Sequence, residues 1–349
     1  MERVKAFLKR KQVVISVQTY LIDALGAMAF GLFASLLIGT IFGTLGEKTG
    51  VVIFTTIAGY AKSATGAALG VSIAYALKAP TLVLFSAATV GIAGNELGGP
   101  VGALVATIIA AELGKIVSKE TPVDILVTPG VTIISGILAA QFVGPGVSAF
   151  MTAFGNLVKT ATVMQPLFMG ILVSALIGIA LTLPISSAAI CIMLSLDGLA
   201  GGAATAGCCA QMVGFAVMSF KENKWSGLLA QGIGTSMLQI GNIVKNPMIW
   251  IPPTLASAVT GPIATCIFRM KMNGDAVASG MGTCGLVGQI GVYTGWVSDI
   301  AAGTKAAITP MDWAAMALLC FVLPAVLSVV FCEVERKLGW IKEGDLKLN

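Results

Sequence analysis

The sequence predicts an all-α polytopic membrane protein with about ten transmembrane helices and additional broken or re-entrant segments. Three observations predict this fold class. Only 11% of the 349 residues are charged, whereas a soluble domain has about 25% because its surface must be solvated. Hydrophobic residues make up 56% of the chain, and the mean hydropathy is +0.93. The 42 glycines are typical of membrane helices, where small residues such as Gly39 and Gly43 let backbones pack closely.

The apolar runs give candidate spans of about 20 residues, the length that crosses a hydrocarbon core. In the first half of the chain the expected spans are 18–45, 51–76, 80–98, 100–118 and 122–143. In the second half they are 198–220, 226–249, 251–268, 274–298 and 310–332.

The stretch 145–190 does not divide cleanly into spans. Pro145, Pro166 and Pro184 separate a semi-polar piece (147–164), an apolar piece (165–183) and a short piece (185–196). Membranes tolerate such interruptions only inside protein or beside a cavity, so we expect broken or re-entrant helices here. The expected number of crossings is therefore eight to twelve.

The pattern divides the chain into four regions. They are a cytoplasmic N-terminus (1–17), a first transmembrane half (18–143), a second half with the broken helices (144–332) and a cytoplasmic tail (333–349). Residues 1–14 are basic and predict an amphipathic helix on the anionic cytoplasmic leaflet, so membrane lipids are an expected partner. A cleaved signal is not expected, because the apolar run from Tyr20 to Gly46 is too long.

The loop charges predict a bacterial inner-membrane protein with both termini in the cytoplasm, because Lys and Arg favour cytoplasmic loops. Sixteen of the 21 basic residues then lie inside: Arg3, Lys5, Lys9, Arg10, Lys11, Lys78, Lys115, Lys119, Lys221, Lys224, Arg269, Lys271, Arg336, Lys337, Lys342 and Lys347. Lys48 and Lys305 fall in outside loops, and Lys62, Lys159 and Lys245 fall within segments. The net charge of +5 thus reflects topology, and no nucleic-acid partner is expected.

The residue types exclude much catalytic chemistry. The chain has no histidine, which rules out Ser-His-Asp, Cys-His and HExxH sites. Its seven cysteines stand in apolar surroundings without CxxC spacing, as expected of small buried side chains rather than metal ligands. The Gly-rich stretch 280–291 lies in an apolar run and does not follow a strand, which favours helix packing or a ligand-facing turn over nucleotide binding. We therefore expect no enzyme, metal or cofactor.

Polar side chains embedded in apolar sequence are the candidate site residues, because ionisable groups are costly inside a membrane. Glu96, Asp197 and Lys245 are the candidate charges, although Glu96 and Asp197 are equally suited to helix caps or interfacial loops. Lys245 is suited either to an anionic solute or to a carboxylate partner. Ser186, Ser187 and Gln289 are further candidates near the interrupted segments.

The stretch 239–247 is the most specific of these signals. Gln239, Asn242, Lys245 and Asn246 precede Pro247 within one apolar region. A helix that breaks at Asn246-Pro247 frees backbone carbonyls, which together with the amides suit a polyhydroxylated or amide-bearing solute. We expect this stretch to bind the solute.

The chain resembles the membrane subunit IIC of bacterial phosphotransferase-system sugar transporters, in particular the stand-alone branch without A or B domains. The likeness covers the whole chain, and its most specific blocks are NPMIWIPPTLASAVTGPIA (246–264) and GMGTCGLVGQIG (280–291). Looser similarity to the fructose type lies in GGPVGALVATIIAAEL (98–113), in 128–150 and in 170–190. Asn246-Pro247 stands where the fructose type has Asp-Pro, and no carboxylate occupies the acidic position near Met237 to Gln239.

The resemblance implies a permease component that binds and translocates a carbohydrate or similar small polar solute. It implies a homodimer, with a scaffold and dimerisation part in 18–143 and a solute-binding transport part in 144–332. Any phosphotransfer comes from separate IIA and IIB subunits, since this chain has neither the phosphoryl-carrying histidine nor a IIB domain.

Two other functions remain open at this point. One is a small-solute transporter or exporter of the same fold without phosphotransfer, and the other is a membrane receptor or regulator that transports nothing. Neutral carboxamides both donate and accept hydrogen bonds, so the missing carboxylate does not exclude sugar binding.

Overall fold

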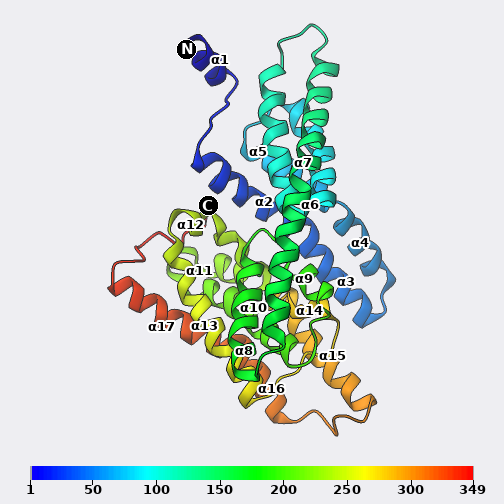
Figure 1. The fold of residues 1–349 in the computed structure, drawn as a ribbon, viewed down its shortest axis with the longest axis vertical. Coiled ribbons are helices and arrows are strands. Elements are labelled where there is room, and N and C mark those ends of the chain that lie inside the picture. The colour runs from blue at the N-terminus through cyan, green and yellow to red at the C-terminus, as the bar shows by residue number, and fades with distance from the viewer. Residues whose placement is uncertain (1, 349) are drawn as a thin grey trace. The chain divides into compact units, whose positions relative to one another are not determined.

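A computed structural model describes residues 2–348, except the side chains of residues 2–5, Lys48 and Met193. The side chains of Arg3, Lys5 and Lys48, for which the sequence predicts a side of the membrane, are among those not described. The chain forms two compact units that divide between Phe150 and Met151, within helix α7 (Asp124–Thr162). Nearly all of the regular structure in the described residues is helical, in agreement with the all-α membrane fold (Figure 1).

The first unit holds six helices and the start of α7. They are α1 (Glu2–Arg10), α2 (Ala24–Leu32), α3 (Ile38–Thr49), α4 (Val52–Ser63), α5 (Thr65–Ala76) and α6 (Thr81–Val117), with π-helical turns η1 (Gln18–Asp23) and η2 (Phe33–Leu37). Helices α5 and α6 pack along each other (Figure 1). A Cβ on Gly70 of α5 would lie 1.9 Å from the Ala87 carbonyl of α6, so only glycine permits this approach.

Helix α6 is bent back on itself where the sequence separates the spans 80–98 and 100–118. Gly98 and Gly99 leave the helical conformation, and Gly99 has φ +59°, a value that glycine adopts readily. Gly94 and Ala103 then lie against each other across the bend. The predicted separation of these two segments is confirmed, whereas the predicted span 51–76 is broken at Ala64 into α4 and α5.

Lys115, expected on the cytoplasmic side near the end of the span 100–118, lies in the last turn of α6, where its side chain is 1% exposed. Its amine donates to the carbonyls of Gln12 and Leu77 and to the Glu112 carboxylate at 2.9–3.0 Å. The N-terminal helix is also tied to this region, since Arg10 and Lys11 pair with Glu120 at 2.8 and 2.6 Å. The hydrogen bond from Lys11 lowers the pKa of the Glu120 carboxyl from its ordinary value.

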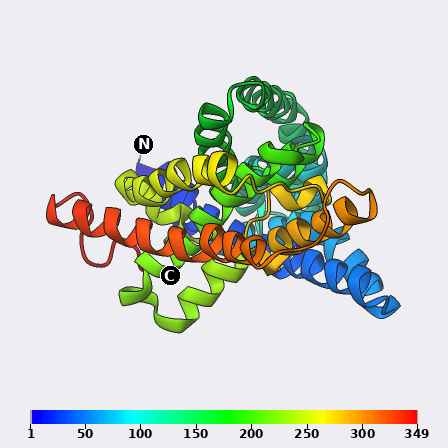
Figure 2. The same cartoon turned by 90° about the horizontal axis from the view of Figure 1, so that it is seen from below.

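The second unit contains the remaining helices. They are α8 (Pro166–Thr182), α9 (Ser187–Met193), α10 (Gly198–Met218), α11 (Phe220–Leu229), α12 (Ile240–Lys245), α13 (Ile251–Pro262), α14 (Ala276–Ser279), α15 (Val287–Ala301), α16 (Pro310–Ala317) and α17 (Leu323–Lys337). Short π or 3-10 turns join several of them: η3 (Ala230–Gly234), η4 (Ser236–Gln239), η5 (Pro247–Trp250), η6 (Ile263–Ile267), η7 (Cys284–Leu286) and η8 (Leu318–Val322). In Figure 2 α16, η8 and α17 form one long run.

Helix α10 is the centre of the second unit. It is buried almost along its whole length, with α8, α13 and α17 packed around it. A Cβ on Gly207 would lie 2.0 Å from the Ser174 carbonyl of α8, so the glycine lets the two backbones touch. Its 21 residues span about 30 Å, enough to cross the hydrocarbon core.

The segment 274–298 does not cross as predicted. It begins and ends at the same place, because Asn273 donates to both carboxylate oxygens of Asp299 at 2.9 and 3.0 Å. Between these residues the chain passes through α14, a turn at Gly282 with φ +54°, and α15. Residues 273–299 therefore form a re-entrant hairpin. Hydropathy measures apolar content but not direction, which is why the sequence predicts a span here.

Two other boundaries also differ from the sequence prediction. Helix α7 continues through Pro145, which was expected to end it, so 147–164 is the end of a long helix and not a separate piece. The expected span 226–249 is broken into α11, η3, η4 and α12. The apolar piece 165–183 is confirmed as α8, and the short piece 185–196 as α9 with a turn.

Five helical stretches in the described residues are long and apolar enough to span a membrane. They are Gln18–Glu47, Thr81–Val117, Asp124–Thr162, Gly198–Met218 and Pro310–Lys337. Helices α5 and α8 are apolar but shorter. With the broken segments, this arrangement agrees with a polytopic membrane protein.

Candidate functional site

A buried group of polar side chains surrounds Gln211 in the middle of α10. The Gln211 side-chain oxygen accepts hydrogen bonds from Thr182 at the end of α8 and from the Trp250 indole, both at 3.1 Å. Its amide nitrogen donates to Thr254 at 3.1 Å. Thr182 also bonds to Ser236 at 2.8 Å. These five side chains come from α8, α10, η4 and the continuous run of η5 and α13, and we call them the polar junction.

The tip of the re-entrant hairpin reaches the same depth of α10. A Cβ on Gly282 would lie within 2.9 Å of Cys208 and Cys209, and the Thr283 hydroxyl donates to the Gly232 carbonyl. Ser187 at the start of α9 donates to the Gly280 carbonyl at 2.7 Å. The hairpin tip, the α8–α9 break and the break at η3–η4 therefore converge beside the middle of α10.

The convergence of helix breaks beside the middle of α10 indicates a candidate binding site. Backbone freed from a helix is tolerated in a membrane only when it is buried in protein or lines a cavity. The sequence places small and polar residues at each of these breaks, including Ser187, Ser236 and Thr283, whose hydroxyls satisfy neighbouring groups. Such a site offers neutral donors and acceptors that suit a hydroxyl-rich solute.

The predicted stretch 239–247 lies beyond this junction, toward the C-terminal end of α10. Gln231 donates to Ser219 and to the Gly227 carbonyl, and Gln239 donates to Gln231 at 2.8 Å. Asn242 in turn donates to Gln239 at 2.7 Å. The structure thus joins Gln239 and Asn242 in one chain of carboxamides, as their spacing in the sequence suggests.

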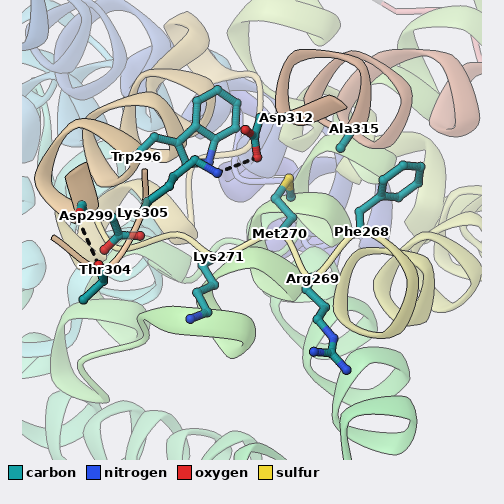
Figure 3. Close-up of a pocket in the computed structure, with 10 residues that line it drawn as sticks. All are labelled: Phe268, Arg269, Met270, Lys271, Trp296, Asp299, Thr304, Lys305, Asp312 and Ala315. Atoms are coloured by element: carbon teal, nitrogen blue, oxygen red, sulfur yellow. Dashed lines mark hydrogen bonds and ion pairs between the residues drawn. The ribbon is translucent and has the colours of Figure 1, made fainter. Parts of the chain in front are cut away.

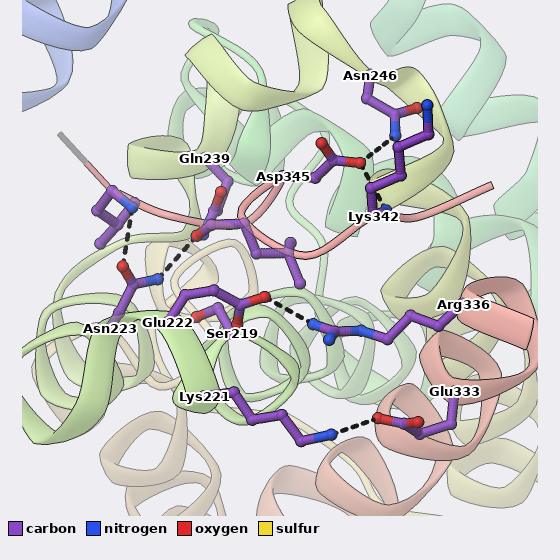
Figure 4. Close-up of polar contacts among 12 residues, drawn as sticks. Ser219, Lys221, Glu222, Asn223, Gln239, Asn246, Glu333, Arg336, Lys342 and Asp345 are labelled. Atoms are coloured by element: carbon purple, nitrogen blue, oxygen red, sulfur yellow. Dashed lines mark hydrogen bonds and ion pairs between the residues drawn. The ribbon is translucent and has the colours of Figure 1, made fainter. Parts of the chain in front are cut away.

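The C-terminal tail lies across these carboxamides, which the sequence did not indicate (Figure 4). Gln239 donates to the Leu346 carbonyl at 2.9 Å, and Asn242 donates to the Lys347 carbonyl at 2.9 Å. Asn246 donates to the Trp340 carbonyl and to the Asp345 carboxylate, at 2.9 and 2.8 Å. The predicted cytoplasmic tail is therefore docked onto the predicted solute-binding stretch.

Ion pairs hold the last helix beside the tail (Figure 4). Arg336 pairs with Glu222 at 2.8 Å, and both side chains are largely buried. Lys221 pairs with Glu333 at 3.1 Å in a more exposed position. These contacts join the end of α17 to the start of α11, so the helix that precedes the tail is held in place.

A pocket of about 170 Å³ lies at the base of the hairpin (Figure 3). Asp299 and Asp312 line it, with Lys305 paired to Asp312 at 2.8 Å. Arg269 and Lys271 also line it, and their side chains point away from the two carboxylates in Figure 3. Trp296 contributes an aromatic wall, so the base of the hairpin is polar and mixed in charge.

The other predicted site residues are dispersed. Glu96 is exposed on α6 in the first unit, and Asp197 is exposed at the start of α10 without capping it through its side chain. Lys245 is exposed at the end of α12. Ser186 caps α9 by accepting a hydrogen bond from the Ala189 backbone at 3.1 Å.

Gln289 is the remaining candidate, and it is buried beside the middle of α10. Its amide donates to Cys209 at 3.2 Å, while its side-chain oxygen has no hydrogen-bond partner among the described residues. An unpartnered buried acceptor in a polar region suits a ligand or a water molecule. Gln289, which was predicted from the sequence, thus offers an unpartnered acceptor on the hairpin.

Sequence reasoning missed several members of the polar junction. The candidate site residues selected from the sequence did not include Gln211, Thr182, Ser236, Trp250 or Thr254. Each of these residues is common in membrane helices, so residue type by itself carries little signal. Among the described residues, no group of His, Cys, Asp and Glu is arranged to hold a metal ion.

Comparison with known proteins gives one match. A family model described as "Phosphotransferase system, EIIC" matches residues 22–348, which include the polar junction, the hairpin and the docked tail. The matching description does not single out a fructose type, so that finer resemblance stays a prediction. No curated protein and no solved structure shows a significant match.

Proposed function

The chain belongs to the EIIC family of the phosphotransferase system, and we propose that it binds its solute at the polar junction of the second unit. Membership makes it the membrane permease component of a sugar transporter, which acts with IIA and IIB subunits. We further propose that the solute is a neutral carbohydrate, that the active form is a homodimer and that the termini are cytoplasmic.

One observation carries the proposed site, namely the convergence of three helix breaks beside Gln211. The breaks supply hydroxyl and carboxamide groups where a continuous helix bundle would supply only apolar side chains. No carboxylate or amine lines the junction among its five side chains, which favours an uncharged solute. The unpartnered Gln289 oxygen adds an acceptor for a sugar hydroxyl on the hairpin side.

The observed arrangement is closed, because the side-chain amide of Gln211 already has its partners within the protein. A solute must therefore replace some of these bonds with its own hydroxyls, which exchanges one set of neutral hydrogen bonds for another. Such an exchange costs little net free energy, since each bond contributes only about 1 kcal/mol. The re-entrant hairpin is the element best suited to move during this exchange.

The proposal is tested by thermal unfolding of the purified protein with glucose, fructose, mannitol, N-acetylglucosamine and glucose 6-phosphate. A sugar that binds only the folded protein stabilises it by about 2.7 kcal/mol at a hundredfold excess over Kd. We expect one neutral sugar to raise the melting temperature. Gln211→Ala should abolish that shift, whereas Gln165→Ala, an exposed residue before α8, should preserve it.

The outcomes distinguish the open alternatives. A shift that survives Gln211→Ala in a folded protein would move the site away from the junction. No shift with any of these sugars would favour a transporter of another small solute or a receptor that transports nothing. Thr182→Val removes one hydroxyl with little change in volume, so it tests the same site with less risk to folding.

A further inference from the structure

The carboxamides at the end of the second unit form a complete binding surface for an extended peptide. Asn223 donates to the Leu346 carbonyl and accepts a hydrogen bond from the Leu348 backbone, both at 2.8 Å. This donor and acceptor pair on one side chain matches the two groups of a peptide backbone. Gln239 and Asn242 donate to successive carbonyls of the same segment.

The surface also receives apolar side chains of the tail. Leu346 is completely buried and Ile341 is 2% exposed, whereas Lys342, Glu343 and Gly344 between them are exposed. Burial of two anchors with an exposed stretch between them is typical of a peptide bound in a groove, and not of a disordered end. Asp345 closes the turn by accepting from the Lys342 backbone and from Asn246, both at 2.8 Å.

The docked segment is held by hydrogen bonds and apolar burial, and among the described residues it forms no ion pair. Its polar contacts are neutral hydrogen bonds except at Asp345, and the ion pairs of Figure 4 lie on α17 rather than in the tail. Gly339, with φ +76°, separates the tail from the end of α17. This conformation ends the helix, since the Trp340 backbone donates to the Glu335 carbonyl at 3.0 Å, and the tail beyond it is a segment separate from α17.

We propose that residues 340–348 are an exchangeable lid, and that Asn223, Gln239, Asn242 and Asn246 form a receptor for a peptide of this type. The ligand class is an extended peptide with two apolar anchors separated by four residues, the last of which is acidic, as in Ile341, Asp345 and Leu346. When the lid is docked, the carboxamides predicted to meet the solute are occupied by tail carbonyls. These carboxamides lie beyond the polar junction, so the peptide receptor goes beyond the proposed solute site and does not rest on it.

The test uses a fluorescent synthetic peptide of residues 338–349 and a chain truncated after Leu338. We expect saturable binding of the peptide to the truncated chain. Binding to the full chain should be at least about tenfold weaker, because the apparent affinity falls with the fraction of receptor left open. A peptide of the same composition in scrambled order should not bind.

Matched acidic residues of the tail provide the control. Asp345→Ala in the full chain should release the tail and increase peptide binding, because it removes two hydrogen bonds. Glu343→Ala removes the same charge from an exposed position and should leave binding unchanged. Equal effects of the two substitutions would overturn the proposal, as would a folded truncated chain that does not bind the peptide.

A second measurement covers the case in which the truncated chain fails to fold. Amide hydrogen exchange in the full chain should be faster at Lys342 and Leu348 than within α17, and faster still in Asp345→Ala. Tail amides that exchange only with global unfolding would overturn the proposal. The tail covers Gln239, Asn242 and Asn246 and not the polar junction. The sugar-induced thermal shift therefore tests the junction, peptide binding tests the receptor, and either proposal can fail by itself.

Discussion

Buried polar side chains carry most of the information at the scale of single residues. Gln211 and Lys115 are both buried, and each forms hydrogen bonds with partners distant in the sequence. Lys115 binds carbonyls at the ends of other segments, where the negative end of a helix dipole favours a cation. A basic residue counted in the sequence as a sign of the cytoplasmic side thus also connects three segments through hydrogen bonds.

This interpretation of Lys115 predicts a large stability effect. Lys115→Met retains most of the side-chain volume but leaves Glu112 without its 2.9 Å partner. Loss of one member of a buried pair costs about 3–5 kcal/mol, so the melting temperature should fall clearly. The double substitution Lys115→Met with Glu112→Gln should recover part of the loss. A single substitution as stable as the parent would contradict the structural role.

Interrupted helices distinguish the second unit at the scale of secondary structure. The hairpin 273–299 and the breaks at Leu183–Ser186 and η3–η4 place hydroxyl groups and non-helical backbone beside the middle of α10. Asn273 holds the two ends of the hairpin together through the Asp299 carboxylate. It also accepts a hydrogen bond from the Gly198 backbone, which fixes the hairpin to the start of α10.

The base of the hairpin therefore depends on Asn273. Asn273→Ala removes both hydrogen bonds to Asp299 and should destabilise the protein by about 1–3 kcal/mol. Hydrogen exchange should increase within α14 and α15 while the core of α10 stays protected. The exposed Asn156→Ala on α7 serves as the control. Uniform acceleration across the second unit would show that the hairpin is not a separate element.

At the scale of the whole molecule, the question is which side of the membrane each end of α10 faces. Met272 donates to the Gly198 carbonyl, so Lys271 lies at the N-terminal end of α10. Lys221 and Lys224 follow its C-terminal end, where the tail is docked. The prediction that all three lysines face the cytoplasm is wrong if α10 crosses the membrane. Lys305 was predicted outside and shares the hairpin pocket with Lys271, which is consistent with an outside location for both.

Cysteine labelling decides this orientation. The background is Cys266→Ser, because Cys266 is exposed and the other six cysteines are buried. A membrane-impermeant maleimide added to intact cells should label Lys271→Cys but not Lys224→Cys. Labelling of both after lysis confirms that each site is reactive. The reverse pattern would place the C-terminus outside and would contradict the cytoplasmic tail.

The sequence by itself determined the membrane class, the helical fold and the EIIC family, because these depend on apolar content and on ordered motifs along the chain. It also located the glycine break of α6 and placed Gln239 and Asn242, which are hydrogen-bonded to each other, in one candidate stretch. Only the tertiary structure decided that 273–299 turns back, that Lys115 is buried and that the tail covers Asn246. Hydropathy is a local sum, whereas the partner of a buried amide and the direction of a segment depend on contacts between residues about a hundred positions apart, as for Asn246 and Asp345.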